Sequence, residues 1–196
     1  MGCWKCQEAV QGPVCVGCGS IQPLAGAADH YAVIGLPRRY HIEAREIEEA
    51  WRALSRKVHP DRFASRPAVE RRMSLQWTAS LNEARRVLRD PTTRARFLAT
   101  GKAEPDERDR AIDPDFLEQI FELQTRVDEE PQAVAAEASA LRTAAFEALD
   151  ALFTRWETEP TVSLAPAVGA LSRVKYLDTL LASVAGNGGH LGQHRH

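Results

Sequence analysis

Apolar residues recur every three or four positions along most of this chain, and that spacing constrains the fold more than any other feature. The pattern places apolar side chains on one face of an α-helix. It runs through Glu43–Val58 and Val69–Arg89, and it returns in three further segments after residue 113. Patterns typical of strands are essentially absent outside residues 1–22. The sequence therefore predicts an all-α fold.

The segments Glu43–Val58 and Val69–Arg89 are separated by a short stretch that contains Pro60. Because proline disfavours the helical conformation in the residue before it, the first helix should end at His59. We therefore expect two antiparallel helices joined by a loop, with the sequence His59-Pro60-Asp61 at its start.

Prolines divide the second half of the chain into three helices. Asp113-Pro114 has the form of an N-cap followed by a first-turn proline, Pro131 begins the next helix, and Glu159-Pro160 breaks it. The apolar positions are Phe116, Ile120, Leu123 and Val127, then Val134, Ala138, Leu141, Ala145, Leu149, Leu152 and Trp156, then Leu164, Val168, Leu171, Val174, Leu177, Leu181 and Val184. Three amphipathic helices with short connections predict an antiparallel three-helix bundle.

The composition, with 44% hydrophobic and 27% charged residues, is ordinary for a globular protein. No apolar run approaches the length that crosses a bilayer, and no charged-then-apolar leader opens the chain. We therefore expect a cytoplasmic protein without a membrane partner.

The charges are unevenly distributed. Residues 38–72 hold ten Lys and Arg against six Asp and Glu, whereas residues 104–159 hold sixteen Asp and Glu against five Lys and Arg. This asymmetry indicates either two modules with different partners or two solvated surfaces that differ without consequence. The acidic half and the balanced net charge argue against nucleic acid as a partner.

All four cysteines, Cys3, Cys6, Cys15 and Cys18, lie in two C-x2-C pairs near the start of the chain. Clustered cysteines of a reduced cytosol are more often metal ligands than disulfides. Four thiolates form a closed tetrahedral site, so we expect one structural zinc ion and no organic cofactor. Iron in a rubredoxin-like site and a pair of redox-active dithiols remain alternatives.

The tripeptide His59-Pro60-Asp61 is a weak signal alone, since it can simply end a helix. Its context strengthens it, because a helix with a basic face precedes it and a second amphipathic helix follows. In this context the sequence resembles the J-domain proteins, and among them the HscB type of iron–sulfur cluster co-chaperone. The similar segments are Asp29–Tyr40 (DHYAVIGLPRRY), Val58–Ser65 (VHPDRFAS), Ser80–Pro91 (SLNEARRVLRDP), Arg94–Leu98 (RARFL), Asp115–Asp128 (DFLEQIFELQTRVD) and Arg173–Leu180 (RVKYLDTL). Tetracysteine N-termini also occur in some HscB-like proteins.

The resemblance implies a co-chaperone that is not itself an enzyme. Such a protein stimulates the ATPase of a DnaK/HscA-type heat-shock chaperone. An Asp61 carboxylate can accept charge-assisted hydrogen bonds from a partner arginine, and a basic helix face can steer toward an acidic groove. The implied chaperone-binding residues are His59, Pro60, Asp61, Arg52, Arg56, Lys57 and Arg62.

The resemblance also implies that the bundle binds an IscU-type iron–sulfur scaffold. By position, the candidate residues are Leu117, Phe121, Glu122 and Tyr176. Leu117 and Phe121 lie off the predicted core stripe, so we expect them to be partly exposed; the alternative is that all four complete the core. Glu118 and Thr125 depart from the family's common methionine and glutamate, which indicates an altered contact surface.

These observations predict six regions. They are a tetracysteine metal-binding module at 1–22, a linker at 23–28, a J-domain at 29–100, a connector at 101–112, a three-helix bundle at 113–185 and a disordered tail at 186–196. Two other functions fit the same residues. One is a general J-domain co-chaperone for other client proteins, and the other is a redox or electron-carrier protein that uses the C-x2-C pairs.

Overall fold

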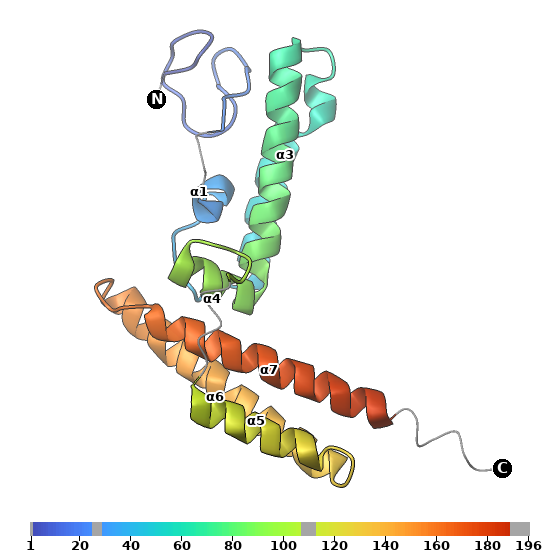
Figure 1. Ribbon diagram of the computed structural model, residues 1–196. Coiled ribbons are helices and arrows are strands. Elements are labelled where there is room, and N and C mark those ends of the chain that lie inside the picture. The colour runs from blue at the N-terminus through green and yellow to red at the C-terminus, as the bar shows by residue number, and fades with distance from the viewer. Residues whose placement is uncertain (1, 25–28, 107–112, 189–196) are drawn as a thin grey trace, which may run out of the picture. The chain divides into compact units, whose positions relative to one another are not determined.

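The computed structural model describes residues 2–24, 29–106 and 113–188, and the chain divides into two compact units, residues 1–94 and 95–196. Within the described residues, regular secondary structure consists of seven α-helices and one short 3-10 helix (Figure 1). The segment that carries the cysteines contains only two isolated β-bridges, Gly2 with Ala9 and Val14 with Ile21. The predicted all-α fold is therefore confirmed.

The first unit is organised by a helical hairpin. Helix α2 (Ala44–Val58) and helix α3 (Ala68–Arg89) pack against one another, and the short helix α1 (His30–Ile34) packs on α3. Their shared core consists of fully or nearly fully buried side chains, including Tyr31, Ile34, Ile47, Val58, Leu81, Ala84 and Leu88. The observed bounds of α2 and α3 differ from the predicted ones by one residue at their first positions.

Helix α4 (Pro91–Thr100) follows α3 after a single residue. Asp90 separates the two helices, and its side chain accepts a 2.6 Å hydrogen bond from the backbone N–H of Thr93. This bond caps α4, because it satisfies a backbone donor that the helix itself leaves free.

The second unit contains the three-helix bundle, formed by α5 (Pro114–Arg126), α6 (Pro131–Thr158) and α7 (Ala165–Gly188) (Figure 1). Asp113 caps α5 by accepting a hydrogen bond from the backbone N–H of Asp115. Side chains from all three helices form one buried cluster: Phe116, Ile120, Leu123, Val127, Val134, Ala138, Leu177, Leu180 and Val184. The predicted bundle and most of its apolar stripes are therefore confirmed.

Several details of the bundle differ from prediction, and they include the buried Phe153 and Ala167, which lie beside the only partly buried Trp156 and Val168 of the predicted stripes. The stripe on α5 suggests a helix to about Glu130, but α5 ends at Arg126 and turns follow it. On α7, Leu180 is buried while the predicted Leu181 is only partly buried. The two leucines are adjacent in sequence, so the period alone does not decide which one meets the neighbouring helices.

Parts of four predicted regions lie outside the described residues: residue 1 of the cysteine module, residues 25–28 of the linker, residues 107–112 of the connector and residues 189–196 of the tail. The tail was predicted to be disordered from residue 186, but residues 186–188 belong to α7, so the bundle extends three residues further than predicted. In the part of the chain that the structure describes, no helix is both long and apolar enough to span a membrane.

Candidate functional site

The loop between α2 and α3 carries His59, Pro60 and Asp61. Helix α2 ends at Val58, and His59 adopts an extended backbone with φ −54° and ψ 133°, as the following proline requires. Pro60 then begins the 3-10 helix η1 (Pro60–Phe63). The His59 Nδ1 atom accepts a 3.3 Å hydrogen bond from the backbone N–H of Asp61, so the imidazole caps the turn.

The functional groups of this loop face solvent. The side chains of His59 and Asp61 are 56% and 89% exposed, and they lie 3.5 Å apart at their nearest atoms. Asp61 therefore presents a carboxylate that has free acceptor positions for a partner's donor groups.

Buried groups on either side hold the loop in place. Val58 and Phe63 are buried and anchor its two ends. The buried Ser74 hydroxyl, on α3, donates a 2.6 Å hydrogen bond to the backbone carbonyl of Val58. This bond satisfies a carbonyl that the end of α2 leaves without a helical partner. The exposed tip is thus fixed from below by α3.

The candidate basic residues Arg52, Arg56 and Lys57 are exposed along α2. Within the described residues, none of the three has a carboxylate at ion-pair distance, whereas Arg45, earlier on the same helix, pairs with Glu49 at 2.7 Å. Arg62 follows the loop, and its guanidinium donates to the backbone carbonyl of Arg56. Helix α2 therefore presents positive charge beside the tripeptide, and no carboxylate of the described residues forms an ion pair with Arg56 or Lys57, the two basic residues of the helix that are closest to it.

The cysteine segment folds as two equivalent turns that are twelve residues apart. The backbone N–H of Cys3 donates to the Glu8 carbonyl, as that of Cys15 donates to the Ser20 carbonyl. Each turn is followed by a left-handed residue, Gln7 with φ 66° and Gly19 with φ 69°. Glycine adopts this conformation without strain, whereas a residue with a side chain rarely does, so the residue type at Gln7 gives no sign of the turn.

The four cysteine thiols form one cluster. The Sγ atoms of Cys3, Cys6, Cys15 and Cys18 all lie within 4.8 Å of one another. The Cys3–Cys18 and Cys6–Cys15 distances are 3.6 and 3.7 Å, far longer than a disulfide bond. A tetrahedron with metal–sulfur bonds of about 2.3 Å has edges of about 3.8 Å. The four cysteines therefore fit a tetrahedral metal ion.

The protonation of the cluster agrees with this fit. Burial raises the pKa of the Cys3 thiol, but hydrogen bonds from the backbone N–H groups of Cys6 and Lys5 outweigh it and lower the pKa to about 6. The backbone N–H of Glu8 lowers the pKa of Cys6, but burial and the adjacent thiols raise it to about 12. Thiolates this close together cannot all ionise without a neutralising cation.

The candidate client-binding residues of the bundle lie on its surface. Leu117, Phe121 and Tyr176 are 43%, 66% and 40% exposed, and they are the exposed large apolar side chains of the second unit's described part. Leu117 and Phe121 are neighbours on α5 because they are four residues apart. Glu122 is exposed beside Phe121. These side chains are therefore not part of the bundle core, which was the alternative prediction.

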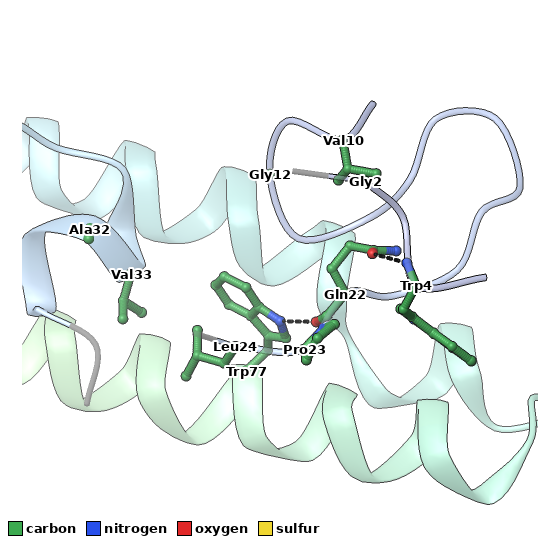
Figure 2. Close-up of a pocket in the computed structure, with 10 residues that line it drawn as sticks. All are labelled: Gly2, Trp4, Val10, Gly12, Gln22, Pro23, Leu24, Ala32, Val33 and Trp77. Atoms are coloured by element: carbon green, nitrogen blue, oxygen red, sulfur yellow. Dashed lines mark hydrogen bonds between the residues drawn. The ribbon is translucent and has the colours of Figure 1, made fainter. Parts of the chain in front are cut away.

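Sequence reasoning missed a contact between the cysteine module and α3. Lys5, inside the first C-x2-C pair, lies 3.5 Å from the carboxylate of Glu70, which is completely buried. The indole N–H of Trp77 donates to the backbone carbonyl of Gln22 (Figure 2). One signal was available: Glu70 is seven residues before Trp77, so it lies on the apolar face of α3.

Comparisons with known proteins agree with the geometry of the loop. A family model described as the DnaJ domain matches residues 29–97. The co-chaperone protein HscB homolog of Bordetella pertussis is 44% identical over 115 residues, which cover 56% of this chain and 68% of the relative. The homolog of Paraburkholderia phymatum is 33% identical over 135 residues, covering 68% and 71% of the two chains.

Two solved structures share the fold. The crystal structure of human co-chaperone protein HscB superposes with a TM-score of 0.74 at 22% identity and covers 96% of this chain and 98% of that chain. Chaperone HscB from Vibrio cholerae has a TM-score of 0.63, also at 22% identity, and covers 84% of this chain and 99% of that chain. At this identity the two likenesses concern the fold alone.

Proposed function

This chain belongs to the HscB family of co-chaperones, and from that premise we propose that it stimulates the ATPase of a DnaK/HscA-type heat-shock chaperone and delivers an IscU-type iron–sulfur scaffold to it. The observation that carries the proposal is the tripeptide His59-Pro60-Asp61, exposed on a loop whose two ends are buried. The proposed role is iron–sulfur cluster assembly and transfer in the cytoplasm.

The loop and the basic face of α2 have complementary roles in this proposal. Lysine and arginine side chains without carboxylate partners attract an acidic groove and set the rate and orientation of encounter. Asp61 then accepts hydrogen bonds from an arginine of the chaperone, and such charge-assisted bonds are about twice as strong as neutral ones. The protein shifts the chaperone toward its hydrolysing conformation by binding that conformation more tightly. It performs no bond chemistry itself.

Steady-state ATP hydrolysis by a DnaK/HscA-type chaperone tests the role of the loop. His59→Gln removes the imidazole that caps η1, so we expect at least tenfold weaker stimulation. His41→Gln, which alters an exposed histidine outside the loop, is the matched control and should stimulate as the unaltered protein does. Full stimulation by the His59 variant contradicts the proposal.

The proposed scaffold-binding surface consists of Leu117, Phe121, Glu122 and Tyr176. Exposed apolar side chains flanked by carboxylates suit an interface with apolar anchors and a polar rim. Replacing Leu117, Phe121 and Tyr176 together with alanine should abolish scaffold pull-down and leave helicity intact. Leu75→Ala removes a similarly exposed leucine from α3 and is the control. Unchanged scaffold binding by the triple variant contradicts the assignment.

The rate of iron–sulfur cluster transfer distinguishes a co-chaperone specific for the scaffold from one that serves many client proteins. If the scaffold is the client, the protein with chaperone and ATP should accelerate transfer of a scaffold-bound cluster to an acceptor protein. A general J-domain co-chaperone would instead protect unfolded chains and leave that transfer rate unchanged.

We also propose that Cys3, Cys6, Cys15 and Cys18 hold one structural zinc ion. A closed shell of four thiolates leaves no position for a substrate, and it supplies the order that a segment this short lacks. Metal analysis of protein purified under reducing conditions should find one zinc per chain. Stoichiometric iron with a visible absorption band would favour the rubredoxin-like alternative.

A further inference from the structure

The cysteine module contacts α3 through a buried carboxylate. Glu70 is completely buried, and within the described part of the chain its carboxylate forms an ion pair with the Lys5 ammonium, 3.5 Å away. The second carboxylate oxygen of Glu70 has no hydrogen-bond partner in the described structure. Burying a carboxylate is unfavourable unless a partner compensates its charge. Lys5 can compensate it only while the turn between Cys3 and Cys6 keeps its shape.

A second contact runs from the thiol cluster to the same helix through Gln22. The Gln22 side-chain amide donates to the Cys3 sulfur at 3.4 Å and to the Ser20 carbonyl at 2.8 Å. Its backbone carbonyl accepts the indole N–H of Trp77 at 2.8 Å (Figure 2). Gln22 and Trp77 are both nearly buried. Gln22 therefore forms hydrogen bonds both with Cys3, a candidate metal ligand, and with Trp77 of α3.

The segment of α3 that receives these contacts also supports the loop. Ser74 lies between Glu70 and Trp77 in sequence, and its hydroxyl holds the Val58 carbonyl at the end of α2. Arg66, between η1 and α3, lies against Gly19, because a Cβ built on that glycine would be 3.4 Å from the arginine Nη2 atom. The second turn of the module is thus adjacent to the loop end of the hairpin.

We propose that metal occupancy of the cysteine module is coupled to the conformational stability of residues 60–77, and therefore to the presentation of His59-Pro60-Asp61. The proposal rests on the metal site proposed above. Metal binding fixes both turns, which places Lys5 on Glu70 and Gln22 on Trp77. Without metal, the turns lose their shape, the Glu70 carboxylate loses its compensating charge and α3 opens more readily near the loop.

Coupling of this kind is reciprocal. If metal stabilises residues 60–77, then intact contacts with α3 must strengthen metal binding by the same factor. The two contact residues on α3, Glu70 and Trp77, are outside the thiol cluster. Changing them alters the coupling without altering any ligand.

The test compares Glu70→Gln and Trp77→Phe, singly and combined, with Glu83→Gln and Trp51→Phe as matched controls. Glu83 pairs with Arg86, and the Trp51 indole donates to Asn82, so the controls remove similar bonds elsewhere in the hairpin. Zinc affinity is measured by competition with a chelator, and hydrogen exchange is measured segment by segment in the full chain with and without zinc.

In the unaltered protein, zinc should slow exchange in residues 60–77 about tenfold, and the combined variant should bind zinc about tenfold more weakly. Its zinc-dependent difference in exchange should fall below about twofold, while both controls behave as the unaltered protein does. If Trp77→Phe lowers helicity, Glu70→Gln alone decides the result. Unaltered zinc affinity in the variants, with exchange in residues 60–77 independent of zinc, overturns the coupling. Failure of the unaltered protein to bind zinc refutes the zinc site together with the coupling.

Discussion

The loop between α2 and α3 and the exposed face of α5 and α7 are fixed by different kinds of contact. The loop presents polar and charged groups, and its geometry is held by the buried Val58 and Phe63 at its two ends and by Ser74 of α3. The bundle face presents Leu117, Phe121 and Tyr176, which project from helices that a separate set of apolar residues already packs.

The geometry of the two surfaces should therefore depend on buried residues to different degrees. The loop contains only one short 3-10 helix, η1, so its geometry depends on the buried residues that support it, and changes to those residues should impair it. An apolar face on a packed helix keeps its geometry when its own side chains are removed. We therefore expect the largest loss of stability from a change in the bundle core and the smallest from the loss of one ion pair of the hairpin.

The largest difference in stability is expected between variants of the bundle core and variants of its exposed apolar residues. Leu177 is fully buried in the core cluster, so Leu177→Ala should lower the free energy of unfolding by about 2–5 kcal/mol. The triple alanine variant of Leu117, Phe121 and Tyr176 should lower it by less than about 1 kcal/mol per residue. Urea unfolding followed by circular dichroism measures both. A loss of stability per replaced residue that is as large in the triple variant as in Leu177→Ala would remove the distinction between core and face.

A buried residue should control the loop. Ser74→Ala removes the donor to the Val58 carbonyl and leaves that buried oxygen unpaired, which should destabilise the first unit by about 1–3 kcal/mol. The same variant should weaken ATPase stimulation, although Ser74 is inaccessible to a partner. Ser80→Ala, on the same helix, is the control. Normal stimulation by the Ser74 variant would show that the loop holds its own geometry.

The two surfaces should also differ in their response to salt. Replacing Arg52, Arg56 and Lys57 with alanine should weaken chaperone binding about three- to tenfold at low ionic strength and reduce its salt dependence. Scaffold binding should not change, because its proposed anchors are apolar. Binding titrations at two salt concentrations measure this, with Arg45→Ala as the control. A salt slope identical to that of the unaltered protein contradicts the steering role.

The smallest effect is expected at an ion pair between α2 and α3. The Glu48 carboxylate accepts a 2.7 Å hydrogen bond from Arg85, and this bond lowers the pKa of Glu48 despite partial burial. A carboxyl with a lowered pKa stabilises the fold above its unfolded-state pKa, and that contribution is lost as pH falls through the folded-state pKa.

Glu48→Gln should therefore cost less than about 1 kcal/mol at neutral pH and reduce the loss of stability in acid. Urea unfolding at pH 7 and in the acid range compares it with Glu49→Gln, whose carboxylate pairs within α2 alone. A larger acid-induced loss in the Glu48 variant than in the unaltered protein would reverse the expected sign.

Much of the helical architecture could be predicted, because it depends on local properties. The three-to-four spacing predicts α2, α3 and the bundle helices, and Asp113-Pro114 and Pro131 mark where α5 and α6 begin. Pro60 ends α2 through a steric restriction on the preceding residue. The end of α5 was less predictable, since the apolar pattern continues past Arg126 into turns.

Parts of the candidate sites could also be predicted, because they depend on residues that are close together in sequence. The C-x2-C spacing places two thiols on each turn, and the residues after α2 place an imidazole and a carboxylate on one loop. The meeting of all four Sγ atoms within 4.8 Å agrees with what the two pairs predicted.

The sequence by itself determined which segments form helices, where most of those helices begin, where α2 ends and where the loop falls, because neighbouring residues and backbone sterics set those features. Only the tertiary structure decided that Glu70 is buried beside Lys5, that Ser74 supports the end of α2, and that Gln22 meets Trp77. These contacts join residues that are 16 to 65 positions apart. Their partners are chosen when separate segments pack together, and no local pattern of residue types encodes that choice.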